Sequence, residues 1–180
     1  TELNSKTIDC IWNGMTATDE LKNQINFSSA YMNNSQVAVI RKADAAKYKD
    51  LASMSGAKVV AEAGSAGEIA VKADAGLSKS YLPVKDQGTS LMEVKSKTAD
   101  IAIIDAVTAA GSIGEGTDYD DLMIVDVISS ADSEVYAVGI RKSDTELTAK
   151  INAAIKELYD DGTLAKLAEK YNLSGRVIAQ

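Results

Sequence analysis

Histidine is absent from this 180-residue sequence, and cysteine, proline, tryptophan and phenylalanine each occur once. Without histidine, the Ser-His-Asp and Cys-His arrangements of nucleophilic catalysis and the usual zinc sites are excluded. The single Cys10 cannot form an internal disulfide, and its apolar neighbours predict a buried, inert thiol rather than a nucleophile. Acid–base chemistry is thereby left to carboxylates.

Long apolar runs and an excess of positive charge are missing as well. No stretch reaches the roughly 18 apolar residues of a membrane-spanning helix. The formal net charge is −7, which argues against nucleic acid as a partner, because that partner requires a basic surface. A hydrophobic content of 46% still supports a proper core, in one domain or two small lobes. The sequence begins at Thr1 rather than Met and is expected to be a processed or trimmed product.

What is present is organised around the segment KVVAEAGSAGEI, residues 58–69. Its apolar start predicts a short buried strand, and the Gly/Ser turn at 64–67 predicts the start of a helix. Free amides at such a helix start, with the positive end of the helix dipole, favour a phosphate or carboxylate. The glycine spacing matches neither GxGxxG nor GxxxxGK[ST], so nucleotide binding has little support. An ordinary strand-to-helix connection remains the alternative.

Strands are expected to alternate with helices along the chain, which predicts an α/β fold with a parallel sheet. Residues 32–35 are expected to be a polar break, and Gly76 is expected to stop the helix that follows residue 67. The Ser143–Glu146 spacing predicts a capping box, and Gly162 is expected to end the helix after it. Pro83 disfavours a central strand. The apolar runs predict strands at 8–12, 36–40, 59–61, 101–104, 122–128 and 135–140, and helices that begin near Thr18, Glu68, Thr89, Ala106, Thr145 and Thr163.

Two opposite ligand-binding features fall at strand ends, where ligands of such sheets bind. The turn amides at 64–67 attract a negative group, and the carboxylate of Asp105 attracts a positive one. A zwitterion is the simplest molecule that satisfies both. The alternative for Asp105 is a helix N-cap, because aspartate is a preferred cap residue.

Several segments resemble one known family in the same order. These are IDCIWNGMTATDE with INFSSAYMNNSQVAVIRK, then KVVAEAGSAGE with TADIAIIDAVTA, and finally EVYAVGIRKSDTELTAKINAAIKELYDDGTLAKLAEKY. They are similar to the extracytoplasmic solute-binding proteins for polar amino acids, over about residues 4–173. The resemblance implies a periplasmic-binding-protein-like two-lobe fold that captures an amino acid in an interlobe cleft and delivers it to the membrane permease of an ABC importer. It also implies an extracytoplasmic protein with a signal peptide or lipid anchor.

The resemblance also implies a domain organisation. Residues 1–33 and 136–180 are expected to form a partial lobe 1, and residues 34–135 a complete lobe 2. Relatives begin with a strand, a helix and a second strand of lobe 1 that are not matched here. A lobe without them exposes sheet edge and apolar surface. We therefore expect lobe 1 to be stable only when its sheet is completed, either by a partner chain that exchanges elements or by packing against another surface.

Carried over by position, the family's ligand contacts fall on residues of both lobes. The resemblance implies that Asp105 binds the ammonium group and that the helix-start amide of Ala66 binds the carboxylate. Glu62 would face the ligand side chain, although a lone exposed charge at a strand end is the alternative. No cofactor and no metal is implied. The full set of expected ligand-binding residues is Asn13, Gly14, Thr16, Glu62, Ser65, Ala66 and Asp105.

One departure from the family pattern concerns the ligand's charge. The family places an arginine after the lobe 1 turn, where this sequence has Leu21, which cannot donate a hydrogen bond. The site then favours a positive or neutral amino acid over glutamate or aspartate. Trp12 is expected to pack in the core of lobe 1. A ligand-sensing domain of a receptor and a dehydratase-type enzyme on the same fold are the other functions considered.

Overall fold

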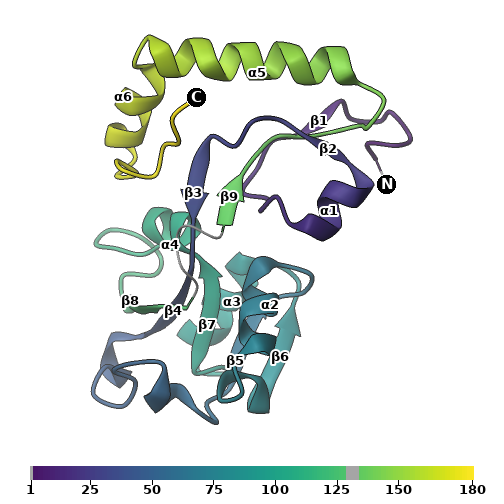
Figure 1. Cartoon of the computed structure of the whole chain (residues 1–180). Coiled ribbons are helices and arrows are strands. Elements are labelled where there is room, and N and C mark those ends of the chain that lie inside the picture. The colour runs from purple at the N-terminus through teal and green to yellow at the C-terminus, as the bar shows by residue number, and fades with distance from the viewer. Residues whose placement is uncertain (1, 129–133) are drawn as a thin grey trace. The chain divides into compact units, whose positions relative to one another are not determined.

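The computed structural model describes residues 2–128 and 134–180, and its backbone divides into two compact units (Figure 1). Unit 1 comprises Thr1–Asn34 and Ala131–Gln180, and unit 2 comprises Ser35–Ser130. The sequence assigned 34–135 to lobe 2, and the equivalence of lobe 2 with unit 2 stays a prediction. No helix in the described part of the chain is both long and apolar enough to cross a membrane.

Unit 2 is built on a five-stranded sheet in the order β6-β5-β7-β4-β8. β5 runs parallel to β6 and β7, but β4 is antiparallel to both of its neighbours, so the expectation of a purely parallel sheet is wrong. The parallel strands are joined through helices, whereas β4 enters the unit almost directly from the preceding strand. The strands are β4 (Gln36–Arg41), β5 (Val59–Glu62), β6 (Tyr81–Val84), β7 (Ile101–Asp105) and β8 (Leu122–Val127). Pro83 lies in the edge strand β6, as its missing N–H requires.

Both faces of this sheet are buried, because alternate residues of its central strands join two separate apolar clusters. In β4, Val37 and Val39 belong to one cluster, and Ala38 and Ile40 belong to the other. β7 divides in the same way. Fully apolar strands such as 101–104 are therefore explained by burial from both sides.

The helices of unit 2 are α2 (Ala66–Ala73), α3 (Gln87–Lys95) and α4 (Ala106–Ser112), and the 3₁₀ helices are η1 (Lys42–Asp44), η2 (Ala52–Met54) and η3 (Leu77–Ser80). Two helices of unit 2 start at a capping side chain, Ser65 at α2 and Asp86 at α3. Gly76 does not stop α2, which ends three residues earlier. Asp74 instead accepts hydrogen bonds from the amides of Gly76 and Leu77, at 2.8 and 2.9 Å, and so opens η3.

Unit 1 contains only short strands. β1 (Cys10–Ile11) and β2 (Asn26–Phe27) flank β10 (Gly139–Ile140), and β3 (Met32–Asn34) pairs with β9 (Glu134–Tyr136). The predicted single strand at 135–140 is therefore two strands, and the predicted polar break at 32–35 is largely strand β3. The polar side chain of Asn34 is tolerated there because it donates a 3.1 Å hydrogen bond to the buried Glu134 carboxylate. Cys10 is a free thiol that is only partly buried, which corrects the expectation of a buried residue.

The helices of unit 1 are α1 (Asp19–Gln24), α5 (Thr145–Asp160) and α6 (Thr163–Lys170). Thr18 caps α1 as expected, and Gly162 separates α5 from α6 in the left-handed conformation, with φ 78°. The capping box predicted at 143–146 does not form. Asp144 occupies the N-cap position without a side-chain cap bond, because its carboxylate pairs with Arg141 at 2.7 Å.

Candidate functional site

The carboxyl ends of the parallel strands β5 and β7 bring the unit 2 residues of the predicted site together. Glu62 ends β5 and Asp105 ends β7, while Ser65 and Ala66 start α2 directly after β5. The two carboxylates are close enough to influence each other electrostatically. This is the edge at which α/β sheets bind ligands.

The Asp105 carboxylate is held by two glutamine side chains. Gln36 Nε2 donates to Oδ1 at 2.5 Å, and Gln87 Nε2 donates to Oδ2 at 2.7 Å. Asp105 is only 4% exposed and, although it precedes α4, its side chain makes no cap hydrogen bond. Asp105 therefore occupies the N-cap position of α4 but does not cap the helix through its side chain.

Glu62 lies in a partly buried, acidic environment. Burial raises the pKa of Glu62 above its ordinary value, and the nearby carboxylates of Asp105 and Asp86 act in the same direction. The backbone N–H of Gln87 hydrogen-bonds to Glu62 and works the opposite way. A positive group placed beside Glu62 and Asp105 would relieve this repulsion.

The start of α2 leaves two amides available for an anion. Ser65 Oγ accepts from the Glu68 amide at 3.1 Å and donates to the Glu62 carbonyl at 2.7 Å, so its hydroxyl is engaged within the turn. Glu68 in turn accepts from the Gly64 amide at 2.8 Å. Within the described residues, the amides of Ala66 and Gly67 have no protein acceptor. These two donors at the positive end of α2 suit a carboxylate.

A close approach of α2 to the sheet depends on Gly67. A Cβ built there would lie 2.9 Å from the Ile103 carbonyl oxygen and 3.0 Å from Gln36 Oε1. Gln36 therefore contacts both the start of α2 and the Asp105 carboxylate. The two amides, the Asp105 carboxylate and Glu62 all lie at this strand-end edge of unit 2, and we call this group of residues the half-site.

The remaining predicted residues share one exposed turn of unit 1. Asn13 Oδ1 accepts from the Met15 amide at 3.0 Å, Gly14 is exposed, and Thr16 forms an isolated bridge with Tyr136. Leu21 is half-buried on α1. The neighbouring Lys22 pairs with Asp19 at 2.8 Å, and its side chain is not buried toward the core.

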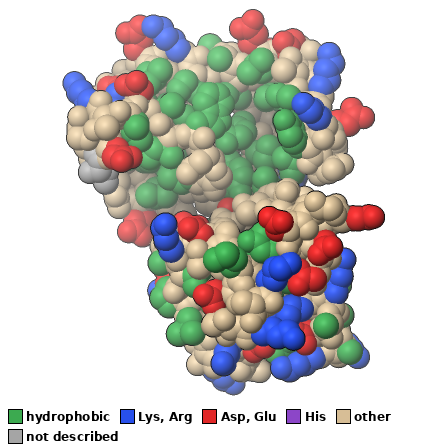
Figure 2. Space-filling view, turned by 180° about the vertical axis from the view of Figure 1, so that it is seen from behind, with side chains coloured by type: hydrophobic (Ala, Val, Ile, Leu, Met, Phe, Trp, Pro, Cys, Tyr) green, Lys and Arg blue, Asp and Glu red, His purple; other side chains and the backbone are tan. Residues whose placement is uncertain are grey.

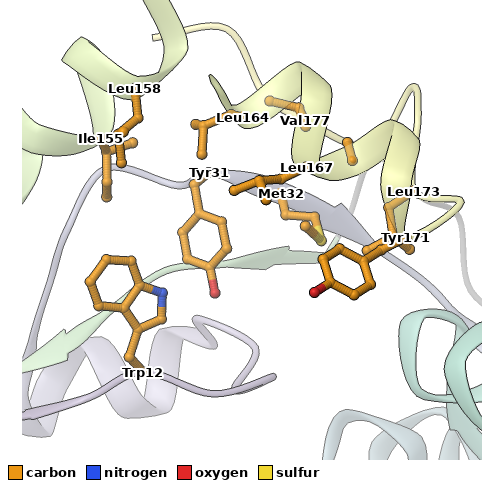
Figure 3. A pocket seen from close by; sticks show the side chains of 11 residues that line it. Trp12, Tyr31, Met32, Ile155, Leu158, Leu164, Leu167, Tyr171, Leu173 and Val177 are labelled. Atoms are coloured by element: carbon orange, nitrogen blue, oxygen red, sulfur yellow. The ribbon is translucent and has the colours of Figure 1, made fainter. Parts of the chain in front are cut away.

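Trp12 does not pack in the core of unit 1, contrary to expectation. Its side chain is 57% exposed, and its ring centroid lies 6.3 Å from that of Tyr31 with the planes tilted by 58°. Both rings line an apolar groove of about 200 Å³ in unit 1 (Figure 3). Hydrophobic side chains gather on this unit in the space-filling view (Figure 2). The groove is lined by Trp12, Tyr31, Met32, Ile155, Leu158, Leu164, Leu167, Ala168, Tyr171, Leu173 and Val177.

Two glutamines of the half-site were not identified from the sequence. Gln36 begins a predicted strand, and Gln87 precedes the predicted start of a helix at Thr89. Neither carries a charge or belongs to a recognised spacing, so pattern alone offered little signal. Their only sequence clue is that each lies at an element boundary next to the strand-end edge.

The sheet of unit 2 and the polar groups at its strand ends define an α/β fold of the kind that binds ligands at that edge. The family model of bacterial extracellular solute-binding proteins, family 3, matches residues 1–174. The chain belongs to that family. It is 34% identical over 175 residues to the arginine-binding extracellular protein ArtP of Bacillus subtilis (strain 168), covering 95% of this chain and 66% of that protein.

Solved structures show the same periplasmic-binding-protein-like fold. A mutant of ArgBP from T. maritima superimposes with a TM-score of 0.80 at 32% identity, covering 94% of this chain and 71% of that one. The ancestral amino acid-binding protein AncCDT-1, a precursor of cyclohexadienyl dehydratase, also gives a TM-score of 0.80, at 30% identity over 94% of this chain and 71% of that one. The chain spans just under two thirds of the length of the curated relative ArtP.

Proposed function

We propose that this chain is part of the substrate-binding component of an ABC importer and that its ligand is an amino acid with a positive or neutral side chain. In this proposal Asp105 receives the α-ammonium, and the amides at the start of α2 receive the α-carboxylate. Glu62 faces the ligand side chain, and Asn13, Gly14 and Thr16 contribute the contacts of unit 1. No cofactor or metal takes part.

The observation that carries this proposal is the acidic pair at the strand ends. Glu62 and Asp105 end the paired strands β5 and β7, and the only complementary donors described at the same edge are neutral amides. With Leu21 where relatives carry an arginine, the site lacks a fixed cation to pair with a second ligand carboxylate. Arginine is therefore expected to bind more tightly than glutamate. The arginine-binding relatives support the same choice.

Titration calorimetry against arginine, lysine, glutamine and glutamate tests this assignment. Asp105→Ala is expected to weaken arginine binding about 30-fold to several thousand-fold, because it removes one partner of a buried charge pair. Glu62→Gln is expected to weaken arginine binding more than glutamine binding. The exposed Glu115 offers a matched control, Glu115→Gln, which should leave all affinities unchanged. Glutamate as the tightest ligand, or an Asp105→Ala variant that binds like the wild type, would refute the proposal.

Binding without turnover is part of the same proposal. The dehydratase-type alternative deserves a test because a precursor of a dehydratase shares the fold. Incubation with arogenate or prephenate is expected to give no product. Product formation above that of a Glu62→Gln control would favour an enzyme instead.

The proposed partner is the permease of an amino-acid ABC importer, and the proposed location is outside the cytoplasm, with a signal peptide or lipid anchor on the native protein. The family's description as extracellular supports this location. Antibody labelling of intact cells that express the native gene should detect the protein at the surface or in the periplasm. Recovery in the cytoplasm alone would refute it.

We further propose that unit 1 is completed by elements exchanged with a second copy of the chain. Seven large hydrophobic side chains are exposed among the described residues. Three of them line the apolar groove: Trp12, Leu167 and Tyr171. β1 and β2 pair only with β10 within the described part, so their outer edges are open to a further strand. Sedimentation of the chain is expected to show a dimer, and a clean monomer with low binding of a hydrophobic dye would count against this.

A further inference from the structure

One residue holds the Asp105 carboxylate of the half-site. Gln87, the first residue of α3, donates its side-chain Nε2 to Asp105 Oδ2 at 2.7 Å and accepts the Asp105 backbone N–H with Oε1 at 3.1 Å. Its backbone N–H also influences Glu62, since it lowers the pKa of that carboxyl. The side chain of Gln87 thus holds Asp105 at two points, next to the second acidic group of the half-site.

We propose that Gln87 is the positioning residue of this half-site, and that it holds the Asp105 carboxylate in the position and orientation that receive a cationic amino acid. This inference rests on the proposed function for the identity of the ligand. Gln87 is not expected to touch the ligand, because both polar ends of its side-chain amide are used by Asp105.

The physical argument is that paired carboxylates repel each other and need fixed donors to remain in one geometry. The two-point contact between the Gln87 amide and Asp105 restrains the carboxylate in both position and orientation. Gln36 restrains the other oxygen from the opposite side, at 2.5 Å. The Gln87 backbone N–H lies in the first turn of α3, which Asp86 caps, and it lowers the pKa of the nearby Glu62 carboxyl.

A Gln87→Glu substitution separates positioning from a general structural role. The new carboxyl keeps the shape of the side chain but, when ionised, loses the donor and faces the carboxylates of Asp105, Asp86 and Glu62. When protonated, it regains a donor toward Asp105. Arginine binding is therefore expected to fall about 10-fold to 100-fold at pH 7.5, with the deficit relative to the wild type shrinking as the pH is lowered toward 5.

Calorimetry with arginine at several pH values measures this deficit. Gln24→Glu adds the same charge at an exposed position on α1 and should stay within about 2-fold of the wild type at every pH. A Gln87→Glu variant that binds arginine like the wild type at pH 7.5 overturns the inference. A deficit that is the same at every pH also overturns it, because it would reflect general damage to the fold.

A second measurement needs no ligand. In Gln87→Ala the Asp105 amide loses its acceptor, so its hydrogen exchange, followed by NMR in the full chain, is expected to become at least about 10-fold faster. Unchanged exchange of that amide overturns the positioning role. A wild-type chain that fails to bind arginine would refute the proposed function, whereas the exchange rate would still decide the role of Gln87.

Discussion

The backbone of Gly67 approaches that of Ile103 so closely that a Cβ on Gly67 would lie 2.9 Å from the Ile103 carbonyl oxygen. The neighbour is a backbone atom in a buried central strand, so it cannot rotate away as a side chain would. The packing of α2 on β7 therefore requires a residue without a Cβ at position 67. The same packing fixes the amides at the start of α2.

Gly67→Ala is therefore expected to destabilise the chain by about 1–3 kcal/mol, the usual cost of overpacking. Gly111 provides the control, because it lies inside α4 and a Cβ there meets nothing within 4 Å. Gly111→Ala should be neutral or stabilising by about 0.5–1 kcal/mol, since alanine favours a helix. Urea unfolding measures both. Equal effects of the same sign would contradict the close approach of α2 to β7.

The raised pKa of Glu62 predicts a stability that depends on pH. Because the folded chain binds the Glu62 proton more tightly than the unfolded chain does, its stability falls as the pH rises from the unfolded pKa through the raised folded one. Glu62→Gln removes this loss, so the variant should gain stability relative to the wild type at pH 7 and gain less near pH 4. Urea unfolding at both pH values checks the prediction. The exposed Glu115→Gln control should show no such pH-dependent gain in stability. A gain of the same size in the control would contradict the prediction for Glu62.

Residues 34–135 are expected to fold on their own. The sheet of unit 2 is complete in sequence between Ser35 and Ser130, and both of its faces bury apolar clusters made of residues of that unit. A segment that carries its own core should unfold cooperatively. Thermal unfolding of the isolated segment, followed by circular dichroism, provides the measurement. A gradual, non-cooperative loss of signal would show that unit 1 is required.

The apolar groove of unit 1 predicts how self-association responds to mutation. Leu167 is 46% exposed and lines the groove, so Leu167→Lys should place a charge in the proposed contact and shift the chain toward monomer. The control is Leu82→Lys on the edge strand β6 of unit 2, where the leucine is 58% exposed. Sedimentation velocity of the wild type and both variants is the measurement. If the Leu82→Lys control loses the dimer, or if Leu167→Lys leaves the dimer unaffected, the groove is not the dimer contact and the prediction is wrong.

Short-range patterns were sufficient to predict most elements. The apolar runs at 59–61 and 101–104 are buried strands, and the turn at 64–67 opens a helix, as expected. The capping-box spacing was assigned to the wrong place, however. Ser65 and Glu68 have the same spacing, and Ser65 caps α2 by accepting from the Glu68 amide, although the Glu68 carboxylate accepts from Gly64 rather than from Ser65. The side chain of Asp144 instead pairs with Arg141. A cap motif therefore predicts a hydrogen bond that does not form when a charged neighbour, here Arg141 three residues earlier, binds the capping side chain.

Sequence alone determined the family, the strand and helix periodicity, and the presence of Glu62 and Asp105 at strand ends, because each of these is recorded in neighbouring residues. Only the tertiary structure decided that β4 runs antiparallel, that Trp12 lies in an exposed groove, and that glutamines hold Asp105. Gln36 and Gln87 lie 69 and 18 residues away from Asp105 in sequence. Neutral amides carry no pattern that identifies a distant partner, since their contacts arise only when packing of the apolar strands brings the element ends together.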